Sequence, residues 1–331
     1  MKSLVTGGTG FLGKRLALRL VELGHEVSVI GRNERVGLDL EESGINFIKA
    51  DLKDTNEITE ACKNQDYVFH CGALSSPWGK YQDFYNTNVL GTKNIIQGCQ
   101  KHKIKRLIYV STPSIYFDFT DKFNISENTP LPENPVNDYA KTKLMAEKKI
   151  DKAFNEGLPV ITIRPRGIFG PGDTSILPRL IKANNNRFIP VIEHRKVLVD
   201  ITYVDNIIEA LLLCIDSPEY TLGKKYNITN GEPVLLYDFL ENVITKLGYK
   251  FNPKTLSFNE AYKIAGLMEF ISRTLLFGKE PALTQYTVGI LARSQTLDIS
   301  SAKRELGYVP KISINDGVDE LIRWWKDKHA C

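Results

Sequence analysis

The chain has 331 residues, of which 42% are apolar and 25% charged, a composition that excludes a largely disordered protein. The formal net charge of +4 is too small to favour nucleic acid as a partner, and a pocket for an anionic cofactor would account for it equally well. The five cysteines are widely spaced and lack a C-x-x-C pair, so neither a disulfide framework nor a zinc site is expected. With no signal peptide and no run of ~20 apolar residues, the sequence predicts a cytoplasmic protein without a transmembrane segment.

The first half of the chain alternates short apolar runs with helical patterns. The predicted strands are Ser3–Thr6, Glu26–Ile30, Asn46–Ala50, Tyr67–Cys71, Arg106–Val110 and Val160–Arg164. The predicted helices between them are Phe11–Leu23, Thr55–Lys63, Phe84–His102 and Asp138–Asn155. Several strands are rich in Val and Ile, as buried parallel strands are. This alternation predicts an α/β fold with a Rossmann-type, doubly wound parallel sheet.

The pattern changes after Arg164, where Pro and Gly residues cluster. Beyond this cluster we expect shorter elements in a smaller α+β part that binds the substrate. They are helices near Ser175–Asn184, Asp205–Cys214, Leu235–Leu247 and Asn315–Lys328, and strands near Val197–Thr202 and Lys225–Thr229. The predicted division is a cofactor domain over residues 1–165 and a substrate part over 166–331, with segments that return to the first domain. Ala261–Phe277 reads as an amphipathic helix packed on the protein's own core; a substrate lid or contact with a membrane surface is the alternative.

A glycine-rich segment, Gly7-Gly8-Thr9-Gly10-Phe11-Leu12-Gly13, joins the first predicted strand to the first predicted helix. Glycines let bare backbone approach a pyrophosphate closely, and a helix N-terminus supplies oriented N–H donors. A preceding strand and a following helix are the context that a dinucleotide-binding loop requires. We therefore expect five of these residues to bind the cofactor: Gly7, Gly10, Phe11, Leu12 and Gly13.

The residue that ends the second strand discriminates between nicotinamide cofactors. An acidic residue there binds ribose hydroxyls and disfavours a 2′-phosphate, whereas this chain has Arg32. A guanidinium binds phosphate bidentately, so NADP(H) is favoured; NAD(H) is the alternative, with Arg32 as an ordinary surface residue. Asp51, after the third strand, could bind the adenine amino group or cap a helix, and Leu52 beside it is expected to contact the cofactor.

Tyr139 and Lys143 begin a helical pattern between the fifth and sixth predicted strands. Residues four apart share a helix face, so the phenol and the ammonium can face one pocket. A phenol ordinarily titrates near ~10, and an adjacent ammonium lowers that pKa, so that Tyr139 can exchange a proton with a substrate alcohol or ketone. Tyr220 and Lys224 share the spacing, but they enclose Gly223 in a breaker-rich stretch, and we interpret that match as accidental.

A third polar group is expected to polarise the substrate oxygen. Ser111, Thr112 and Ser114 follow the strand Arg106–Val110, where hydroxyls also commonly cap turns. Thr112 is the first candidate and Ser111 the second. The five histidines have no ligand spacing, and neither G-x-S-x-G nor H-E-x-x-H occurs, so the sequence predicts no metal site.

Together these motifs resemble the extended short-chain dehydrogenase/reductase family, in the superfamily of NAD-dependent epimerases and dehydratases. The resemblance rests on Thr6–Gly13, Val110–Thr112, Tyr139–Lys143 and Arg164-Pro165, and it covers roughly residues 1–230. Asn86–Thr92 is similar to a helix motif of the family, in which an Asn has a structural role beside the active site. The resemblance implies that Lys143 also holds the nicotinamide ribose. Members commonly form dimers through the helices of the cofactor domain, which implies a homodimer.

Within that family the sequence is most similar to the 3β-hydroxysteroid dehydrogenase-like branch, including its bacterial 2-alkyl-3-oxoalkanoate reductases. The segments that carry this similarity are Ala73–Tyr81, Ser111–Ser114, Arg164–Asp173, Asp200–Asn206 and Asp298–Tyr308. It implies Thr112 as the donor to the substrate oxygen and backbone contacts to the cofactor from Ala73 and Pro165. It also implies β-hydroxy or β-keto acid substrates with bulky apolar groups. The chain departs from the branch in lacking the apolar anchor of its membrane-bound members.

These observations favour an oxidoreductase that interconverts a secondary alcohol and a ketone, with Tyr139 as the acid/base. One alternative is a nucleotide-sugar epimerase or dehydratase that retains its NAD and binds a diphosphate with Arg166, Arg179 and Arg195. The other is a non-catalytic sensor that only binds the cofactor, against which the intact Tyr139 and Lys143 pair argues.

Overall fold

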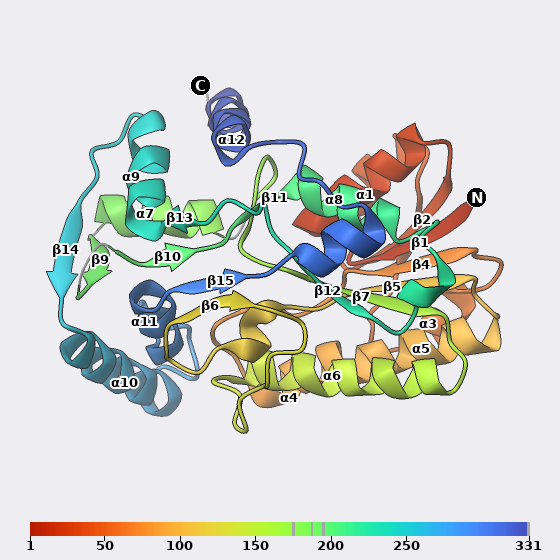
Figure 1. Ribbon diagram of the computed structural model, residues 1–331, viewed down its shortest axis with the longest axis horizontal. Helices are drawn as coiled ribbons and strands as arrows, with labels where there is room; N and C mark the ends of the chain where they lie inside the picture. The colour runs from red at the N-terminus through yellow and green to blue at the C-terminus, as the bar shows by residue number, and fades with distance from the viewer. Residues whose placement is uncertain (174–175, 187, 194–195, 330–331) are drawn as a thin grey trace.

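The computed structural model describes residues 1–173, 176–186, 188–193 and 196–329. A large parallel sheet lies between layers of helices, and a smaller region of short strands and helices extends beyond one end of it (Figure 1). No helix among the described residues is long and apolar enough to cross a membrane.

The large sheet contains, in the described residues, seven strands in the order β12-β7-β5-β4-β1-β2-β3, and every neighbouring pair is parallel. Its strands are β1 (Lys2–Thr6), β2 (Glu26–Gly31), β3 (Asn46–Lys49), β4 (Tyr67–His70), β5 (Arg106–Val110), β7 (Val160–Pro165) and β12 (Lys225–Ile228). The chain order reverses between β1 and β4, and ligands of such folds bind outside the carboxyl ends of the strands at that point. The predicted doubly wound α/β fold is confirmed.

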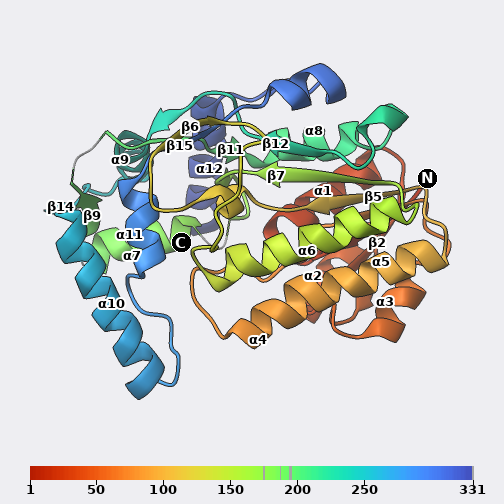
Figure 2. The same cartoon turned by 60° about the horizontal axis from the view of Figure 1, so that its bottom comes forward.

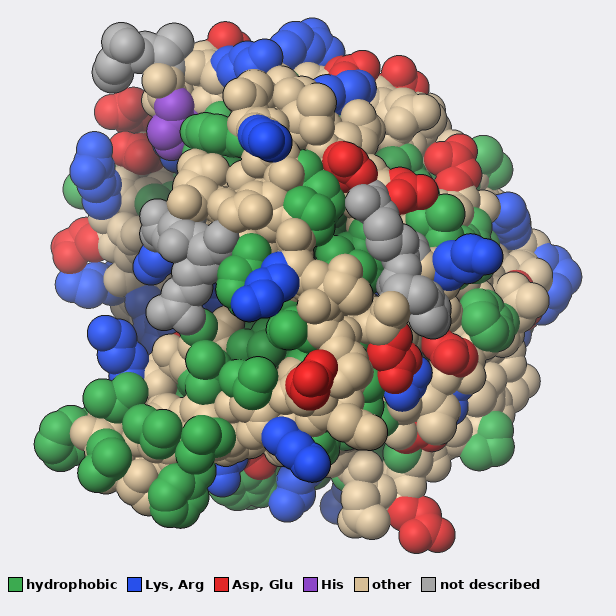
Figure 3. Space-filling model, turned by 90° about the vertical axis from the view of Figure 1, so that its left-hand side faces the viewer, with side chains coloured by type: hydrophobic (Ala, Val, Ile, Leu, Met, Phe, Trp, Pro, Cys, Tyr) green, Lys and Arg blue, Asp and Glu red, His purple; other side chains and the backbone are tan. Residues whose placement is uncertain are grey.

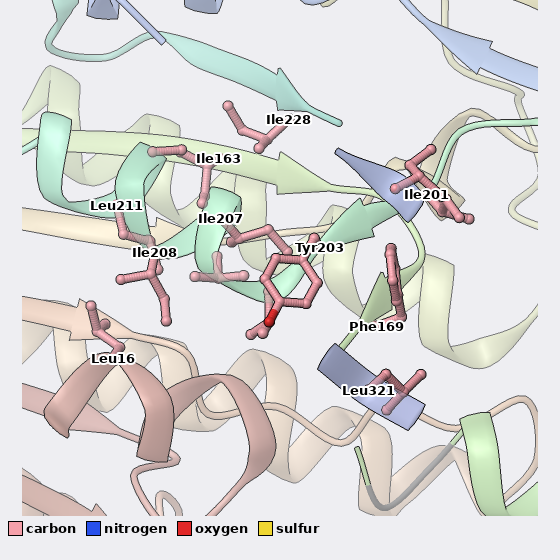
Figure 4. Close-up of a cluster of buried hydrophobic side chains, with 14 of the residues drawn as sticks. Leu16, Ile163, Phe169, Ile201, Tyr203, Ile207, Ile208, Leu211, Ile228 and Leu321 are labelled. Atoms are coloured by element: carbon pink, nitrogen blue, oxygen red, sulfur yellow. The ribbon is translucent and has the colours of Figure 1, made fainter. Parts of the chain in front are cut away.

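Alternate side chains of the strands enter two different cores, which explains their nearly continuous apolar sequences. Val5 packs in a cluster with side chains of α1 (Phe11–Glu22) and α8 (Val204–Leu213). Its neighbour Leu4 packs in a second cluster with side chains of α5 (Gly91–Lys101) and α6 (Asp138–Asn155). Figure 4 shows part of the first cluster, where side chains of α1, α8 and β7 gather around Tyr203. Figure 2 shows α5 and α6 side by side across the other face.

The elements of the first half follow the sequence prediction closely, with one correction. The predicted single helix Phe84–His102 is α4 (Tyr81–Phe84), a π-helical segment (Tyr85–Leu90) and α5. The prediction missed α2 (Glu34–Glu41), while α3 (Thr55–Ala61) lies where a helix was expected. A 3-10 turn (Pro113–Tyr116) and the short strand β6 (Lys122–Ile125) separate β5 from α6.

The second half is more irregular, as expected. The predicted strand Val197–Thr202 is two strands, β10 (Leu198–Val199) and β11 (Thr202–Tyr203), because β10 pairs with β15 whereas β11 pairs with β8. The further strands are β8 (Ile168–Phe169), β9 (Ile189–Ile192), β13 (Val234–Leu235), β14 (Pro253–Leu256) and β15 (Gln295–Leu297). The helices are α7 (Ile176–Asn186), α9 (Leu236–Lys246), α10 (Phe258–Leu275), α11 (Gln285–Ala292) and α12 (Ile314–His329), with short helical turns at Glu219–Thr221 and Ala302–Leu306. Ser175, where α7 was expected to begin, lies outside the described residues. β12 and α8 return to the large sheet, and the predicted division at residue 165 stays a prediction.

Candidate active site

The turn between β1 and α1 presents an open helix N-terminus. Gly10 caps α1 without a side-chain hydrogen bond, and the first turn carries no acidic residue. The first N–H groups of a helix have no acceptor within it, and the helix dipole makes this end positive. The N-terminus of α1 is therefore available to an anionic group such as a pyrophosphate.

Close backbone packing explains the glycines of this turn. Gly7 has a φ of +66°, and a Cβ at Gly7 would lie 2.8 Å from Cα of Gly72. A Cβ at Gly13 would lie 2.3 Å from the Gly7 carbonyl oxygen, so a side chain there would push α1 away from the turn. Both positions hold the helix N-terminus against the carboxyl end of the sheet.

A groove of about 360 Å³ opens beside this turn. Nine of the predicted cofactor residues line it: Gly7, Gly10, Phe11, Leu12, Gly13, Arg32, Asp51, Leu52 and Ala73. Arg32 is exposed at its edge and has no ion pair within the described part of the chain. Asp51 accepts a hydrogen bond from the Lys53 backbone at 3.0 Å and pairs with its ammonium at 3.4 Å. The open helix end and the free cation suit a phosphate-bearing dinucleotide.

The remaining predicted residues, Tyr139, Lys143 and Pro165, do not line this groove. Lys143 is 2% exposed, and its ammonium donates to the Val110 carbonyl oxygen at 2.8 Å. Burial lowers the pKa of Lys143 to about 7, against the opposing influence of Glu147 and Cys71. Val110 ends β5, and β5 pairs with β4, which Cys71 follows at the groove wall. The hydrogen bond to Val110 therefore places the Lys143 ammonium at the strand ends that border the groove.

The Tyr139 hydroxyl lies among other hydroxyl groups. Asn137 caps α6 through the Ala140 backbone N–H at 2.8 Å, which fixes the turn that carries Tyr139. Burial raises the pKa of Tyr139, while hydrogen bonding with Ser75 and Thr112 opposes that rise. The expected lowering by Lys143 is not among these influences.

Thr112 begins a chain of hydroxyls that leads away from Tyr139. Its side chain caps the 3-10 turn after β5 by accepting from the Ser114 backbone N–H at 3.2 Å. It also donates to the Ser114 hydroxyl at 3.1 Å, and Tyr286 of α11 donates to that same hydroxyl at 3.2 Å. Ser111, the second candidate, is buried and its hydroxyl has no partner among the described residues. The structure thus places Thr112 rather than Ser111 in the hydroxyl cluster.

Sequence reasoning missed Ser75 and Tyr286, both of which act on Tyr139. Asn88 holds the Ser75 segment in place: its amide oxygen accepts from the Leu74 backbone N–H at 2.8 Å and its amide nitrogen donates to the Thr142 hydroxyl at 3.1 Å on α6. Asn88 lies in the π-helical segment, a distortion that is frequent at functional sites. The motif Asn86–Thr92 signalled this support, whereas no sequence pattern signalled Tyr286.

Behind the hydroxyl cluster, a buried ion pair joins β7 to α6. Nε and Nη2 of Arg164 donate to the two carboxylate oxygens of Glu147 at 2.9 and 2.5 Å, and Nη1 donates to the Tyr116 hydroxyl. Both charged side chains are at least 97% buried. This bidentate pair fixes the strand end on which Pro165 lies.

The apolar helix predicted at Ala261–Phe277 is α10, which packs on the core through one side only. Ala261 and Ala265 are buried, whereas Leu267, Phe270, Leu275, Leu276 and Phe277 are exposed. Figure 3 shows these side chains gathered in an apolar patch at the lower left. The patch adjoins the loop that contains Ser75 and Trp78. Trp78 donates to the Gly278 carbonyl oxygen at 2.9 Å, and Arg273 lies 4.9 Å from the Trp78 ring.

The three arginines of the epimerase hypothesis do not form a described cluster. Arg179 is half-exposed and pairs with Glu280 at 3.2 Å, and Arg195 lies outside the described residues. Arg166 is buried beyond β7. The described residues also contain no group of three or more His, Cys, Asp or Glu side chains arranged to hold a metal ion.

Comparisons with known proteins agree with this geometry. Residues 4–259 match the 3-beta hydroxysteroid dehydrogenase/isomerase family. A 2-alkyl-3-oxoalkanoate reductase of Stenotrophomonas maltophilia is 35% identical over 97% of this chain and 98% of that protein. A decarboxylating sterol-4-alpha-carboxylate 3-dehydrogenase of Mus musculus is 30% identical over 97% of this chain and 90% of that protein. The solved UDP-glucuronic acid 4-epimerase of Bacillus cereus, in complex with NAD, shares the fold with a TM-score of 0.79 at 22% identity, over 100% of this chain and 98% of that one.

Proposed function

Because the chain belongs to the 3-beta hydroxysteroid dehydrogenase/isomerase family and is an extended short-chain oxidoreductase, we propose that it reduces a β-keto acid with NADPH and catalyses the reverse oxidation. The observation that carries the proposal is the position of the groove next to the face of α6 that holds Lys143 and Tyr139. An anion-accepting groove ends beside Lys143, and Tyr139 lies one helical turn away on the same face of α6.

The residues of this chain move the proton. Tyr139 donates its phenolic proton to the substrate oxygen during reduction and recovers one from the hydroxyl cluster. Thr112 turns its hydroxyl proton from Ser114 to the same oxygen and holds that oxygen next to the phenol. Lys143 is the cation that stabilises a developing phenolate, once it exchanges its contact with Val110 for one nearer the groove. When bound, the dinucleotide supplies the hydride.

Arg32 supports the preference for NADP(H). It lines the groove at the end of β2, is exposed, and makes no ion pair among the described residues, so its fork is free to bind a 2′-phosphate. The neighbouring carboxylate of Glu34 pairs with Lys49 at 2.9 Å and so does not neutralise Arg32.

Two observations support a substrate that combines an acid with a bulky apolar group. The names of the relatives specify an alkyl-substituted 3-oxoalkanoate and a sterol carboxylate. In this chain Trp78 contacts Arg273 of α10 and Gly278, the residue after the apolar patch. Trp78 is three residues from Ser75, and three residues span at most about 10 Å. The patch therefore lies beside the loop that contains Ser75 and offers apolar surface there.

The test is an oxidation assay of the purified protein with 2-alkyl-3-hydroxy acids, a sterol and a UDP-sugar, each with NADP⁺ and NAD⁺. We expect the hydroxy acids to be oxidised, faster with NADP⁺. Arg32→Ser should raise KM for NADP⁺ about 10- to 100-fold, the loss expected for a charge-assisted phosphate contact, and leave KM for NAD⁺ unchanged. Arg35→Ser is the matched control, since this exposed arginine does not line the groove. Turnover of the UDP-sugar alone would contradict the proposal.

A further inference from the structure

Arg166 lies beyond the carboxyl end of β7, with its backbone held on both sides. Its N–H donates to the Ile228 carbonyl oxygen at 3.1 Å, which continues the pairing of β7 with β12. Its carbonyl oxygen accepts from the Thr202 hydroxyl at 2.5 Å. Arg164, two residues earlier on β7, extends to the face of the sheet that α6 covers, where it pairs with Glu147.

The guanidinium of Arg166 has no partner within the described part of the chain. The residue is 8% exposed, and its side chain makes no hydrogen bond or ion pair with any described residue. Burial lowers the pKa of Arg166, whereas Tyr286 and Asp200 act in the opposite direction. The guanidinium nitrogens are not among the completely enclosed polar atoms without a partner, so a group from outside the chain can reach them. A largely buried cation gains more from such a partner than an exposed one does.

The surroundings of Arg166 contain further unsatisfied polar groups. Asp200 accepts from the Leu297 backbone N–H at 2.7 Å with one carboxylate oxygen, and its other oxygen has no partner among the described residues. Gln295 lies beside Asp200, because its backbone carbonyl oxygen accepts from the Asp200 N–H. Neither the oxygen nor the nitrogen of the Gln295 side-chain amide has a partner among the described residues. Native interiors leave few such groups without a ligand, an ion or water.

Tyr286 connects this region to the catalytic residues. The charge of its phenol raises the pKa of both Arg166 and Tyr139. Tyr286 also donates to the Ser114 hydroxyl at 3.2 Å in the chain that begins at Thr112. A ligand group bound at Arg166 would therefore lie on the substrate side of the hydroxyl cluster.

We infer that Arg166 binds the carboxylate of the substrate, an inference that rests on the proposed function. In a β-keto acid the carboxyl carbon is two bonds from the reacting carbonyl carbon, so one substrate can meet Tyr139 and Arg166 together. The planar guanidinium offers the two parallel donors that a carboxylate accepts. This contact neutralises the buried cation and fixes which carbonyl faces the phenol.

The inference is tested with a 2-alkyl-3-hydroxy acid and its methyl ester, because the ester lacks the negative charge of the carboxylate. The wild-type enzyme with NADP⁺ should prefer the acid about 10- to 100-fold in kcat/KM, the range of one charge-assisted contact. Arg166→Met should lose this preference through a raised KM for the acid and leave the ester within about 3-fold. Arg179→Met, at the half-exposed arginine paired with Glu280, is the matched control and should behave as wild type.

The outcomes separate this inference from the proposed function. If the wild type oxidises neither compound, the proposed function fails. If it oxidises both equally, or if a folded Arg166→Met loses acid and ester activity alike, the proposed function stands and the role of Arg166 is overturned. Cofactor binding and thermal melting report whether the variant is folded. Should Arg166→Met not fold, Arg166→Gln serves instead: losing the acid preference supports the inference, and keeping it overturns it.

Discussion

Two regions at the end of β7 differ in whether their buried polar and charged groups have partners within the chain. Around Arg164, every charge is matched within the chain, because Glu147 and Tyr116 accept from three nitrogens of the guanidinium. Around Arg166, two residues further along, buried polar groups lack partners in the described part of the chain. The first region holds β7 against α6, and the second lies beyond the end of β7, where we propose that the substrate binds.

This difference separates residues that support the fold from residues held ready for a ligand. Matched groups stabilise the native state by themselves, whereas unmatched buried groups cost stability until a ligand meets them. Substitutions around Arg164 should therefore reduce stability first, and substitutions in the region of Tyr139, Lys143 and Arg166 should reduce activity first. If substitutions around Arg164 mainly reduced activity, or substitutions around Arg166 mainly reduced stability, the two regions would not differ in this way.

The largest effect is expected from Tyr139→Phe, in the ligand region. Losing the acid/base should lower kcat by about 10²- to 10⁴-fold while cofactor affinity and melting temperature stay near wild type. The measurement is steady-state oxidation of the hydroxy acid, with a fluorescence titration of NADPH. Tyr220→Phe is the matched control, because Tyr220 and Lys224 share the spacing on an exposed turn. A Tyr139→Phe enzyme with wild-type kcat would exclude the proposed proton donor.

In the supporting region, Arg164→Met should lower the free energy of unfolding by about 3–5 kcal/mol, because it leaves the Glu147 carboxylate buried and unpaired. Urea denaturation measures this change, and Arg179→Met is again the surface control. Adding Glu147→Met should recover much of the lost stability, since an apolar pair leaves no buried charge. If Arg164→Met destabilises no more than Arg166→Met, the two regions do not differ as described.

The elements of the first half of the chain were predicted well because their constraints are local. The strand, glycine turn and helix from Ser3 to Leu23 are dictated by neighbouring residues, and the structure reproduces them almost to the residue. The spacing of Tyr139 and Lys143 on α6 likewise follows from one helical turn. The single expected helix Phe84–His102 was wrong in detail, since a π-helical segment arises from the packing of Asn88 against Leu74 and Thr142.

The second half of the chain could not be predicted to the same depth because its contacts are distant in sequence. Tyr286 meets Ser114 across 172 positions, and Trp78 meets Gly278 across 200. Neither contact leaves a periodic signal. The partnerless state of Arg166 was equally hidden, because a sequence shows a charge but not whether the fold supplies its partner. The site assignments for Tyr139, Lys143 and Thr112 stay predictions that the experiments above address.

A smaller effect is expected at Lys143 and concerns the pH dependence of the protein's stability. Burial lowers the pKa of Lys143 from 10.5 to about 7, so between these values the unfolded chain binds more protons at this site than the native state does. Stability from this group therefore rises with pH across that window, by up to about 1.4 kcal/mol for each pH unit. Lys143→Met removes the dependence: its stability relative to wild type should be greatest near pH 7 and decline towards pH 10.

Thermal melts of both proteins between pH 6 and 10, in buffers of equal ionic strength, would measure that decline. Lys141→Met is the matched control, because Lys141 is exposed on the same helix and its removal should change stability little at any pH. Adding NADPH should reduce the difference in stability between the two proteins at pH 7 if the bound cofactor contacts the Lys143 ammonium and stabilises its charge. A difference in stability that does not change with pH would mean that the charged form of Lys143 does not destabilise the native state. Lys143 would then resemble Arg164, whose charge has partners within the chain.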